Sequence, residues 1–184
     1  MSSIPPICDF GWKAPDFNLK NIDGRMISLN EAKAENGLLV MFICNHCPYV
    51  KAIIPKMIRD VNDLRALGIG VVAINANDAV SHPDDSYEMM QKTATEHGFT
   101  FPYLHDETQK IARSYDAVCT PDFFGFDGDL GLQYRGRLDA SRAAPAPDDL
   151  RRDLFLAMKE VAETSKGPTD QIASMGCSIK WKGA

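Results

Sequence analysis

The feature that most constrains this chain is the point where an apolar segment, 38–43, is followed closely by Cys47-Pro48. The apolar segment contains β-branched and aromatic residues, which is typical of a strand buried on both faces of a sheet. Proline is favoured at the first position of a helix, so we expect a helix to begin directly after Cys47. The free N–H groups and the dipole of a helix start favour an anion, and Cys47 is therefore our candidate for a nucleophilic thiolate.

Composition limits the function classes. The 184 residues fit one domain, 1–184, with a sizeable core. A net charge of −5 without a basic run argues against a nucleic-acid partner, and no apolar stretch is long enough to cross a membrane. The first ten residues lack the pattern of a signal peptide, so we expect a cytoplasmic protein. Five cysteines there indicate thiols, redox centres or metal ligands more than a structural disulfide framework.

The order of predicted elements indicates an α/β protein. Strand 38–43, a helix from Cys47 to about Ala66 and strand 69–75 form a parallel crossover pair. The other expected elements are a hairpin around Asp23-Gly24, a short helix 30–36 capped by Asn30, helix 87–97, an extended segment 101–104, helix 108–115, a hairpin of strands 122–126 and 132–135, and helix 148–163 capped by Asp148.

Three segments lie outside this pattern. They are an N-terminal extension, 1–13, an Ala/Pro linker, 143–147, and a C-terminal tail, 164–184. A polar loop, 75–78, follows the second parallel strand, and the carboxyl ends of parallel strands are where α/β sites collect. The same residues are common turn formers, so this loop is either part of a site or a plain turn.

The string Cys-Asn-His-Cys-Pro-Tyr-Val-Lys at 44–51 resembles the active site of thioredoxins. Cys47, Lys51 and Pro55 fall on the first cysteine, the lysine and the helix-kinking proline of the thioredoxin pattern. Val50 stands where the second thioredoxin cysteine belongs. The full string is more specifically similar to a subgroup of redoxin-domain proteins, thioredoxin-like relatives of the peroxiredoxins. The resemblance implies a thioredoxin fold with an N-terminal β-hairpin extension and a mixed central sheet flanked by helices.

A second resemblance lies at Thr120-Pro121, directly before a predicted strand. Thioredoxin-like enzymes carry a cis-proline at this place, facing the active cysteine. The resemblance implies that Pro121 is cis, that the backbone here pairs with an incoming peptide, and that the ring keeps metals off the thiol. Thr120 is then a candidate auxiliary residue of the site.

The partner that would resolve a mixed disulfide on Cys47 is open between three cysteines. Cys44 is ranked first because it has the shortest loop to Cys47. Cys177 is second, because it sits on a tail able to fold back over the site, and the Gly-Cys-x-Ile-Lys-Trp string around it resembles the subgroup. Cys119 is third, because it lies two residues before Pro121. Cys8, near the N-terminus, is interpreted as incidental.

Auxiliary residues are less well determined. His46 is a candidate base for Cys47 or an ordinary loop histidine. Peroxiredoxins place Thr or Ser three residues before the reactive cysteine and an Arg beside it, whereas here Cys44 occupies the first place and Pro121 the second. Arg135 is the candidate substitute, with a solvated strand end as the alternative. The buried Asp of thioredoxins is replaced by Met41.

These patterns predict a thiol-disulfide oxidoreductase that acts through a mixed disulfide on Cys47 and needs no cofactor. The alternative within the same chemistry is a thiol peroxidase that passes through a sulfenic acid. Two further readings are metal binding by Cys44, His46 and Cys47 with Cys119 or Cys177, and a non-catalytic binding module. The partners expected are protein or small-molecule disulfides or peroxides, and a reducing partner such as a thioredoxin or glutathione system.

Overall fold

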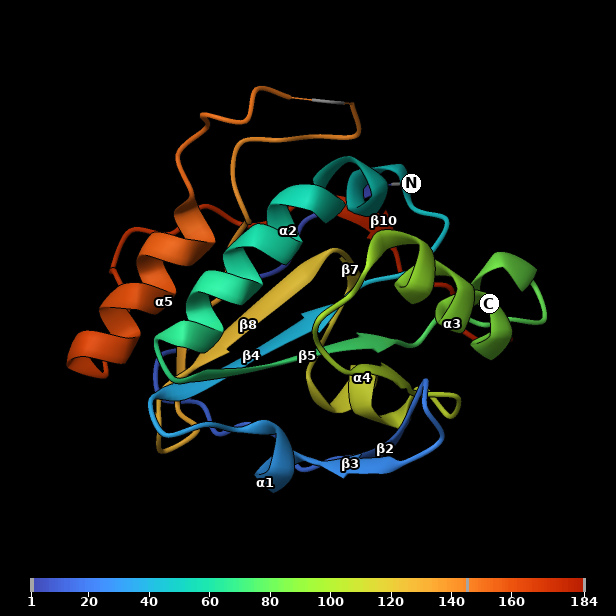
Figure 1. Ribbon diagram of the computed structural model, residues 1–184, viewed down its shortest axis with the longest axis horizontal. Coiled ribbons are helices and arrows are strands. Elements are labelled where there is room, and N and C mark those ends of the chain that lie inside the picture. Colours follow the sequence, from blue (N-terminus) through green and yellow to red (C-terminus); the bar gives the residue numbers. More distant parts are fainter. Residues whose placement is uncertain (1, 145, 184) are drawn as a thin grey trace.

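The computed structural model describes residues 2–144 and 146–183 and is built around a seven-stranded mixed sheet (Figure 1). Its strand order is β3-β2-β6-β5-β4-β8-β9. Strands β4, β5 and β6 are parallel, whereas β8 runs antiparallel to β4. The strands are β2 (Asn18–Asn21), β3 (Met26–Ser28), β4 (Gly37–Phe42), β5 (Ile69–Asn75), β6 (Tyr103–His105), β8 (Asp122–Phe126) and β9 (Leu132–Tyr134).

Strand β4 forms the middle of the core, and this explains its apolar sequence. All six of its residues are buried. Val40 pairs with Val72 of β5 on one side and with Phe124 of β8 on the other. Because helices or loops cover both faces of the sheet, alternation of polar and apolar residues is absent from this strand, as predicted.

Helices cover the two faces of the sheet. Buried side chains of α2 (Pro48–Ala66), α3 (Tyr87–His97) and α5 (Asp153–Thr164) belong to the core on one face. Residues of α1 (Leu29–Ala32) and α4 (Lys110–Ser114) belong to the core on the other face. Figure 1 shows α2 and α5 side by side. This arrangement confirms the predicted thioredoxin fold with its added N-terminal hairpin. Among the helices described, none is both long and apolar enough to cross a membrane.

A second, small sheet joins the two ends of the chain to the site. It has the order β1-β10-β7, with β1 (Ser2–Ser3), β10 (Gly176–Ser178) and β7 (Cys119–Thr120). The peptide bond between Thr120 and Pro121 is cis, as the resemblance implied, and it separates β7 from β8. One extended segment therefore contributes to both sheets. The tail was not predicted to contain a strand.

Two predicted helices differ from those observed. The short helix begins at Leu29 instead of Asn30 and ends at Ala32, because the side chain of Ser28 accepts the N–H of Glu31 and the carboxylate of Glu31 accepts the N–H of Ser28. This reciprocal pattern is a capping box.

The last helix begins at Asp153, five residues after the predicted cap at Asp148. Side chains of α2 hold the backbone before it, since Lys56 donates to the carbonyl of Pro147 at 2.6 Å and Arg59 donates to that of Asp148 at 3.4 Å. Pro145, within the predicted linker 143–147, lies outside the described residues.

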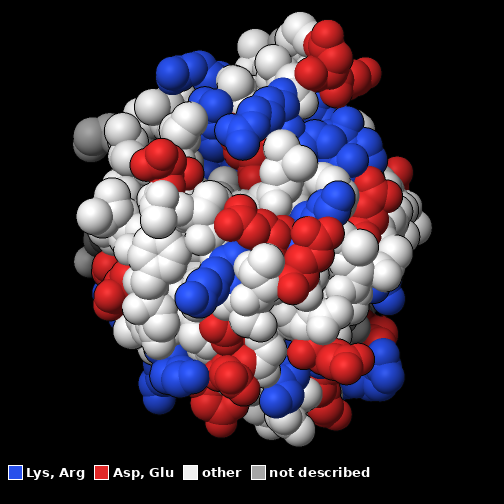
Figure 2. All heavy atoms as spheres, turned by 90° about the vertical axis from the view of Figure 1, so that its left-hand side faces the viewer, with Lys and Arg blue, Asp and Glu red and all other residues white. Residues whose placement is uncertain are grey.

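An arginine bridges α5 to α2. Arg152 contacts the carboxylates of Asp60 and Asp63, each at 2.7 Å, and its guanidinium lies 3.9 Å from the ring centre of Phe155. Asp60 is fully buried and also receives a hydrogen bond from Arg59 at 2.9 Å. Figure 2 views the α5 side and shows Lys and Arg side chains lying among Asp and Glu side chains over this face.

We expect Arg152→Ala to lower the free energy of unfolding by about 1–3 kcal/mol, because the buried carboxylate of Asp60 loses one of its two cationic partners. Urea denaturation followed by circular dichroism measures this change. Lys159→Ala, on the same helix, removes only an exposed pair with Glu163 at 3.9 Å and should change stability by less than about 0.5 kcal/mol. Equal effects of the two substitutions would contradict the role given to Arg152.

Candidate active site

Cys47 stands where the sequence predicted it, at the start of α2. Its carbonyl accepts the N–H of Lys51 at 3.0 Å, and Pro48 occupies the first helical position. A thiolate that exchanges with a substrate disulfide must be reachable from solvent, whereas Cys47 has 0% exposure in this conformation. Its Sγ lies 3.2 Å from the carbonyl oxygen of Thr120, which accepts a hydrogen bond from the protonated thiol. The nucleophile therefore faces the cis-proline turn but is covered.

The cover is the C-terminal tail. Strand β10 pairs antiparallel with β7, and Cys177 lies opposite Thr120 in the register. The Sγ atoms of Cys177 and Cys47 are 2.9 Å apart, both as free thiols, although 130 residues separate them in the sequence. Cys177 is partly exposed, whereas Cys47 is buried. The geometry thus favours Cys177 as the partner of Cys47.

The two sulfurs differ strongly in acidity. The neighbouring thiol of Cys44 lowers the pKa of Cys47 to about 5, and the neighbouring Cys177 and the start of α2 act in the same direction against burial. Burial and the neighbouring Cys47 together raise the pKa of Cys177 to about 11. Cys47 thus sits at the start of α2 as predicted, but its side chain caps no N–H of the helix, and the neighbouring Cys44 has the largest effect on its pKa.

Cys44 and Cys119 remain thiols in this arrangement. The hydrogen bond to Cys47, burial and the nearby carboxylate of Asp85 raise the pKa of Cys44 far above its usual range. Burial raises the pKa of Cys119, whose Sγ donates to the carbonyl of Pro121 at 3.4 Å. The sequence ranked Cys44 ahead of Cys177 as the resolving cysteine, and the geometry favours the reverse order.

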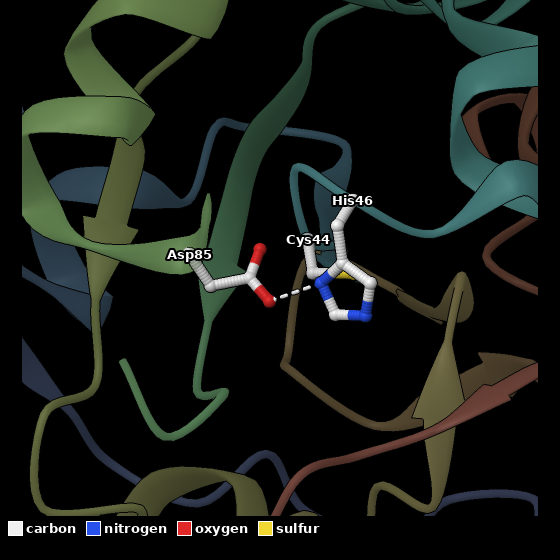
Figure 3. Close-up of side chains that lie close together, drawn as sticks. All are labelled: Cys44, His46 and Asp85. Carbon is white, nitrogen blue, oxygen red and sulfur yellow. Dashed lines mark hydrogen bonds and ion pairs between the residues drawn. The ribbon is translucent and has the colours of Figure 1, made fainter. Parts of the chain in front are cut away.

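His46 forms a hydrogen-bonded pair with Asp85, a residue that the sequence did not single out for the site. The Nδ1 atom of His46 and Oδ2 of Asp85 are 2.5 Å apart (Figure 3). Asp85, at the end of the 3₁₀ turn η1 (Pro83–Asp85), also accepts the backbone N–H of Asn45 at 2.7 Å and the side-chain amide of Asn77 at 2.8 Å. Three donors therefore hold one buried carboxylate, and the carboxylate orients the imidazole.

Within the part of the chain that the structure describes, His46 and Asp85 also form, together with Cys44, a group of side chains that could bind a metal ion. One atom each of Cys44, His46 and Asp85 lie within 4.8 Å of one another. This set differs from the predicted one, because Asp85 takes part while Cys47 faces Cys177. Both carboxylate oxygens already accept hydrogen bonds, and zinc normally takes four protein or water ligands. The cluster is arranged as a histidine–carboxylate pair beside a thiol.

The loop after β5 holds the tail in place. The side-chain oxygen of Asn77 accepts the N–H of Lys180 at 2.9 Å, and the N–H of Asp78 donates to the carbonyl of Lys180 at 2.9 Å. The side chain of Gln109 donates to the same carbonyl at 2.8 Å. Loop 75–78 thus contacts the tail and, through the side chain of Asn77, also the carboxylate of Asp85. The polar composition of the loop was the signal for it, whereas the sequence around Asp85 carried none.

Thr120 and Pro121 belong to the site, while Arg135 lies elsewhere. The hydroxyl of Thr120 lies 3.1 Å from Sγ of Cys44, and its carbonyl contacts Cys47. The guanidinium of Arg135 instead pairs with Asp122 at 3.1 Å and donates to the carbonyl of Asp116 at 2.7 Å. Arg135 is also buried, so it is neither a solvated strand end nor a partner of Cys47.

Comparison with solved structures confirms the fold. An uncharacterized conserved protein from Geobacillus kaustophilus superposes with a TM-score of 0.94 at 43% identity, covering 100% of this chain and 98% of that one. The thioredoxin domain of a thiol-disulfide oxidoreductase from Bacteroides vulgatus gives a TM-score of 0.59 at 19% identity, covering 72% of this chain and 89% of that one. At that identity the second match concerns the fold alone.

Curated relatives match a shorter region. The thiol-disulfide oxidoreductase ResA of Halalkalibacterium halodurans is 25% identical over 105 residues, which are 57% of this chain and 55% of ResA. The chain spans 55% to 65% of the length of the curated relatives it matches. The sequence model of the AhpC/TSA family matches residues 10–136, which is more than half of the chain. The chain therefore belongs to the AhpC/TSA family.

Proposed function

We propose that the protein is a thiol-disulfide oxidoreductase in which Cys47 attacks a substrate disulfide and Cys177 resolves the mixed disulfide. The observation that supports this most is the pair of sulfurs 2.9 Å apart, one with a pKa near 5 and the other near 11. Disulfide exchange needs a thiolate as the attacking group and as the leaving group, and Cys47 suits both tasks at neutral pH.

In the first step the thiolate of Cys47 attacks one sulfur of the substrate disulfide. A new bond forms between that sulfur and Cys47, and the other substrate sulfur leaves as a thiolate that takes a proton from water. In the second step Cys177 attacks the sulfur of Cys47 and releases the remaining half of the substrate as a thiolate. The substrate is reduced to two thiols, and the protein ends as a Cys47–Cys177 disulfide.

The order of these steps follows from the electrostatics of the pair. While Cys47 is a thiolate, its charge and its hydrogen bond keep the proton on Cys177. Once Cys47 is bound in a mixed disulfide, both effects disappear. The pKa of Cys177 then falls, and the positive charge of Lys180 lowers it in the same direction. Cys177 thus becomes a better nucleophile only after the first step is complete.

The tail must open for the first step, since Cys47 is fully covered in the closed conformation. Gly176 is what allows the close approach of β10 to β7: a Cβ at this position would lie 2.0 Å from the carbonyl oxygen of Thr120. An extended peptide that carries a disulfide to Cys47 would need the same edge of β7 that β10 now occupies.

The names of relatives agree with this chemistry, because ResA is a thiol-disulfide oxidoreductase. We propose protein or small-molecule disulfides as substrates and a dithiol protein or glutathione as the reducing partner, in a reducing compartment such as the cytoplasm. The position of Arg135 favours disulfides over peroxides. Cleavage of an O–O bond needs donors beside the thiolate, and Arg135 is bonded to Asp122 instead.

Cysteine variants test the assignment. Cys47→Ser should reduce turnover of a small disulfide at least about a hundredfold, because a serine hydroxyl is a poor nucleophile at neutral pH. In the Cys177→Ser variant the reaction should stop at a mixed disulfide between Cys47 and the substrate, which mass spectrometry detects. Cys8→Ser is the control and should behave as wild type. Wild-type turnover in Cys47→Ser would refute the proposal. Faster turnover with peroxide than with disulfides would favour a peroxidase.

The acidity of Cys47 should depend on Cys44. The thiolate fraction grows with pH, so absorbance at 240 nm should rise through a midpoint of about 5 in the wild-type protein. Cys44→Ala removes the neighbouring thiol that lowers the pKa of Cys47 most and should move this midpoint to higher pH. Cys8→Ser should leave it in place. An unchanged midpoint in Cys44→Ala would show that Cys44 does not stabilise the thiolate.

Access to Cys47 should be limited by the tail. Gly176→Ala should raise the rate at which iodoacetamide alkylates Cys47, because the new Cβ pushes β10 away from Thr120. Gly183→Asn is the matched tail variant. Gly183 has a φ of +74° that asparagine tolerates and has no atom near its Cβ position, so the rate should stay at the wild-type value. Equal rates in Gly176→Ala and wild type would contradict gating by β10.

A further inference from the structure

We propose that the thiol that reduces the oxidised protein attacks the sulfur of Cys177 and expels Cys47 as the leaving group. This inference rests on the proposed function, because it concerns the Cys47–Cys177 disulfide formed there. It assigns Cys177 a second role, as the sulfur through which electrons are delivered to the site.

Cys177 is more accessible to an external thiol than Cys47. Cys47 has 0% exposure, whereas Cys177 is partly exposed on β10. The reduced pair is already 2.9 Å apart in the closed conformation, so forming the bond needs only a small movement of the two sulfurs. In the oxidised protein the tail is then tethered covalently over the site. An external thiol therefore meets Cys177 first.

The direction from which a thiolate must attack the disulfide also favours Cys177. A thiolate attacks a disulfide sulfur along the line of the bond that breaks, from the side opposite the leaving sulfur. At Cys47 that approach is obstructed by the protein, because Cys44, the carbonyl of Thr120 and the start of α2 surround the sulfur. Attack on Cys177 comes from the outer side of the pair, where that residue is partly exposed. The positive charge of Lys180 nearby favours the approach of an anion.

Cys47 is the better leaving group of the two sulfurs. The sulfur of lower pKa leaves faster, and Cys47, at the start of α2 beside the thiol of Cys44, has the lower pKa of the two. Expulsion of Cys177 would instead create a thiolate at a site where burial disfavours it. Access and leaving-group chemistry therefore point to the same sulfur.

Reduction of the Cys47–Cys177 disulfide takes place in two exchanges. The reducing thiolate forms a bond to Cys177, and the electron pair of the Cys47–Cys177 bond leaves with Cys47. A second thiolate, from the same dithiol partner or from another thiol, then attacks the first reducing sulfur. Cys177 leaves and takes a proton from water. The protein gains two electrons and returns to its reduced state, while the reductant becomes a disulfide.

This assignment separates the two halves of the cycle by the position of the tail. Attack on a substrate requires β10 to leave β7, because the sulfur of Cys47 must be reached directly. Reduction takes place with β10 in its place, because the attacked sulfur lies on β10 itself. The substrate and the reductant thus use different conformations of the same site.

The first test maps the mixed disulfide. The oxidised wild-type protein is mixed with glutathione, quenched in acid within seconds, and alkylated with N-ethylmaleimide before peptide mapping. We expect the glutathione adduct on Cys177 and the maleimide on Cys47, in roughly tenfold excess over the opposite pattern. A tenfold ratio of rates corresponds to a difference of about 1.4 kcal/mol between the two activation barriers. The opposite pattern would overturn the assignment.

The second test gives a result even where the adduct is too short-lived to map. Stopped-flow absorbance at 240 nm follows release of the Cys47 thiolate when glutathione reduces the oxidised protein. If Cys47 is the leaving group, Cys44→Ala should slow the reaction by roughly threefold for each unit by which the pKa of Cys47 rises, taking the slope of about 0.4–0.5 known for attacking thiols. Cys8→Ser is the control and should match wild type. An unchanged or faster rate in Cys44→Ala would refute the assignment.

The two proposals fail in different ways. The starting disulfide is verified by mass spectrometry before glutathione is added. Absence of a Cys47–Cys177 disulfide in the oxidised protein would overturn both the proposed function and this inference. A Cys47–Cys177 disulfide that glutathione opens at Cys47 would leave the proposed function intact and overturn only the role given to Cys177.

Discussion

The pairing of the C-terminal strand β10 with β7 is the interaction on which the site depends. It brings Cys177 to Cys47 across 130 residues of sequence and buries the sulfur of Cys47 at the start of α2. The cis-proline turn makes this possible, because it separates β7 from β8 and leaves β7 to pair with the tail. Gly176 lets the two backbones meet, since any side chain there would reach the carbonyl of Thr120.

Around this pairing, neighbouring cysteines acquire different acidities from their contacts. The neighbouring thiols of Cys44 and Cys177 and the start of α2 lower the pKa of Cys47, and their effect outweighs that of burial. Cys44 and Cys177 are less acidic because each sits beside that anion. A single low-pKa sulfur with two thiol donors is an arrangement in which negative charge has one stable location.

The same loop that secures the tail also orders the histidine beside the site. Asn77 accepts the N–H of Lys180 and donates to Asp85, which in turn holds His46. A movement of the tail would therefore reach His46 through two side chains. This connection gives the His46–Asp85 pair a physical link to opening of the site, in addition to its position next to Cys44.

The sequence by itself determined the features that depend on neighbouring residues. The apolar run and Cys47-Pro48 were enough to predict a buried strand followed by a helix, and the family resemblance placed the cis bond at Thr120-Pro121. Tertiary structure decided the rest, because it depends on groups distant in sequence. Side chains of α2 delay the start of α5, Asp85 reaches His46 from η1, and the tail forms a strand only where β7 offers it an edge. Local periodicity holds no information about such long-range contacts. For that reason the short spacing between Cys44 and Cys47 suggested Cys44 as the partner, whereas the fold brings Cys177 from the opposite end of the chain to Cys47.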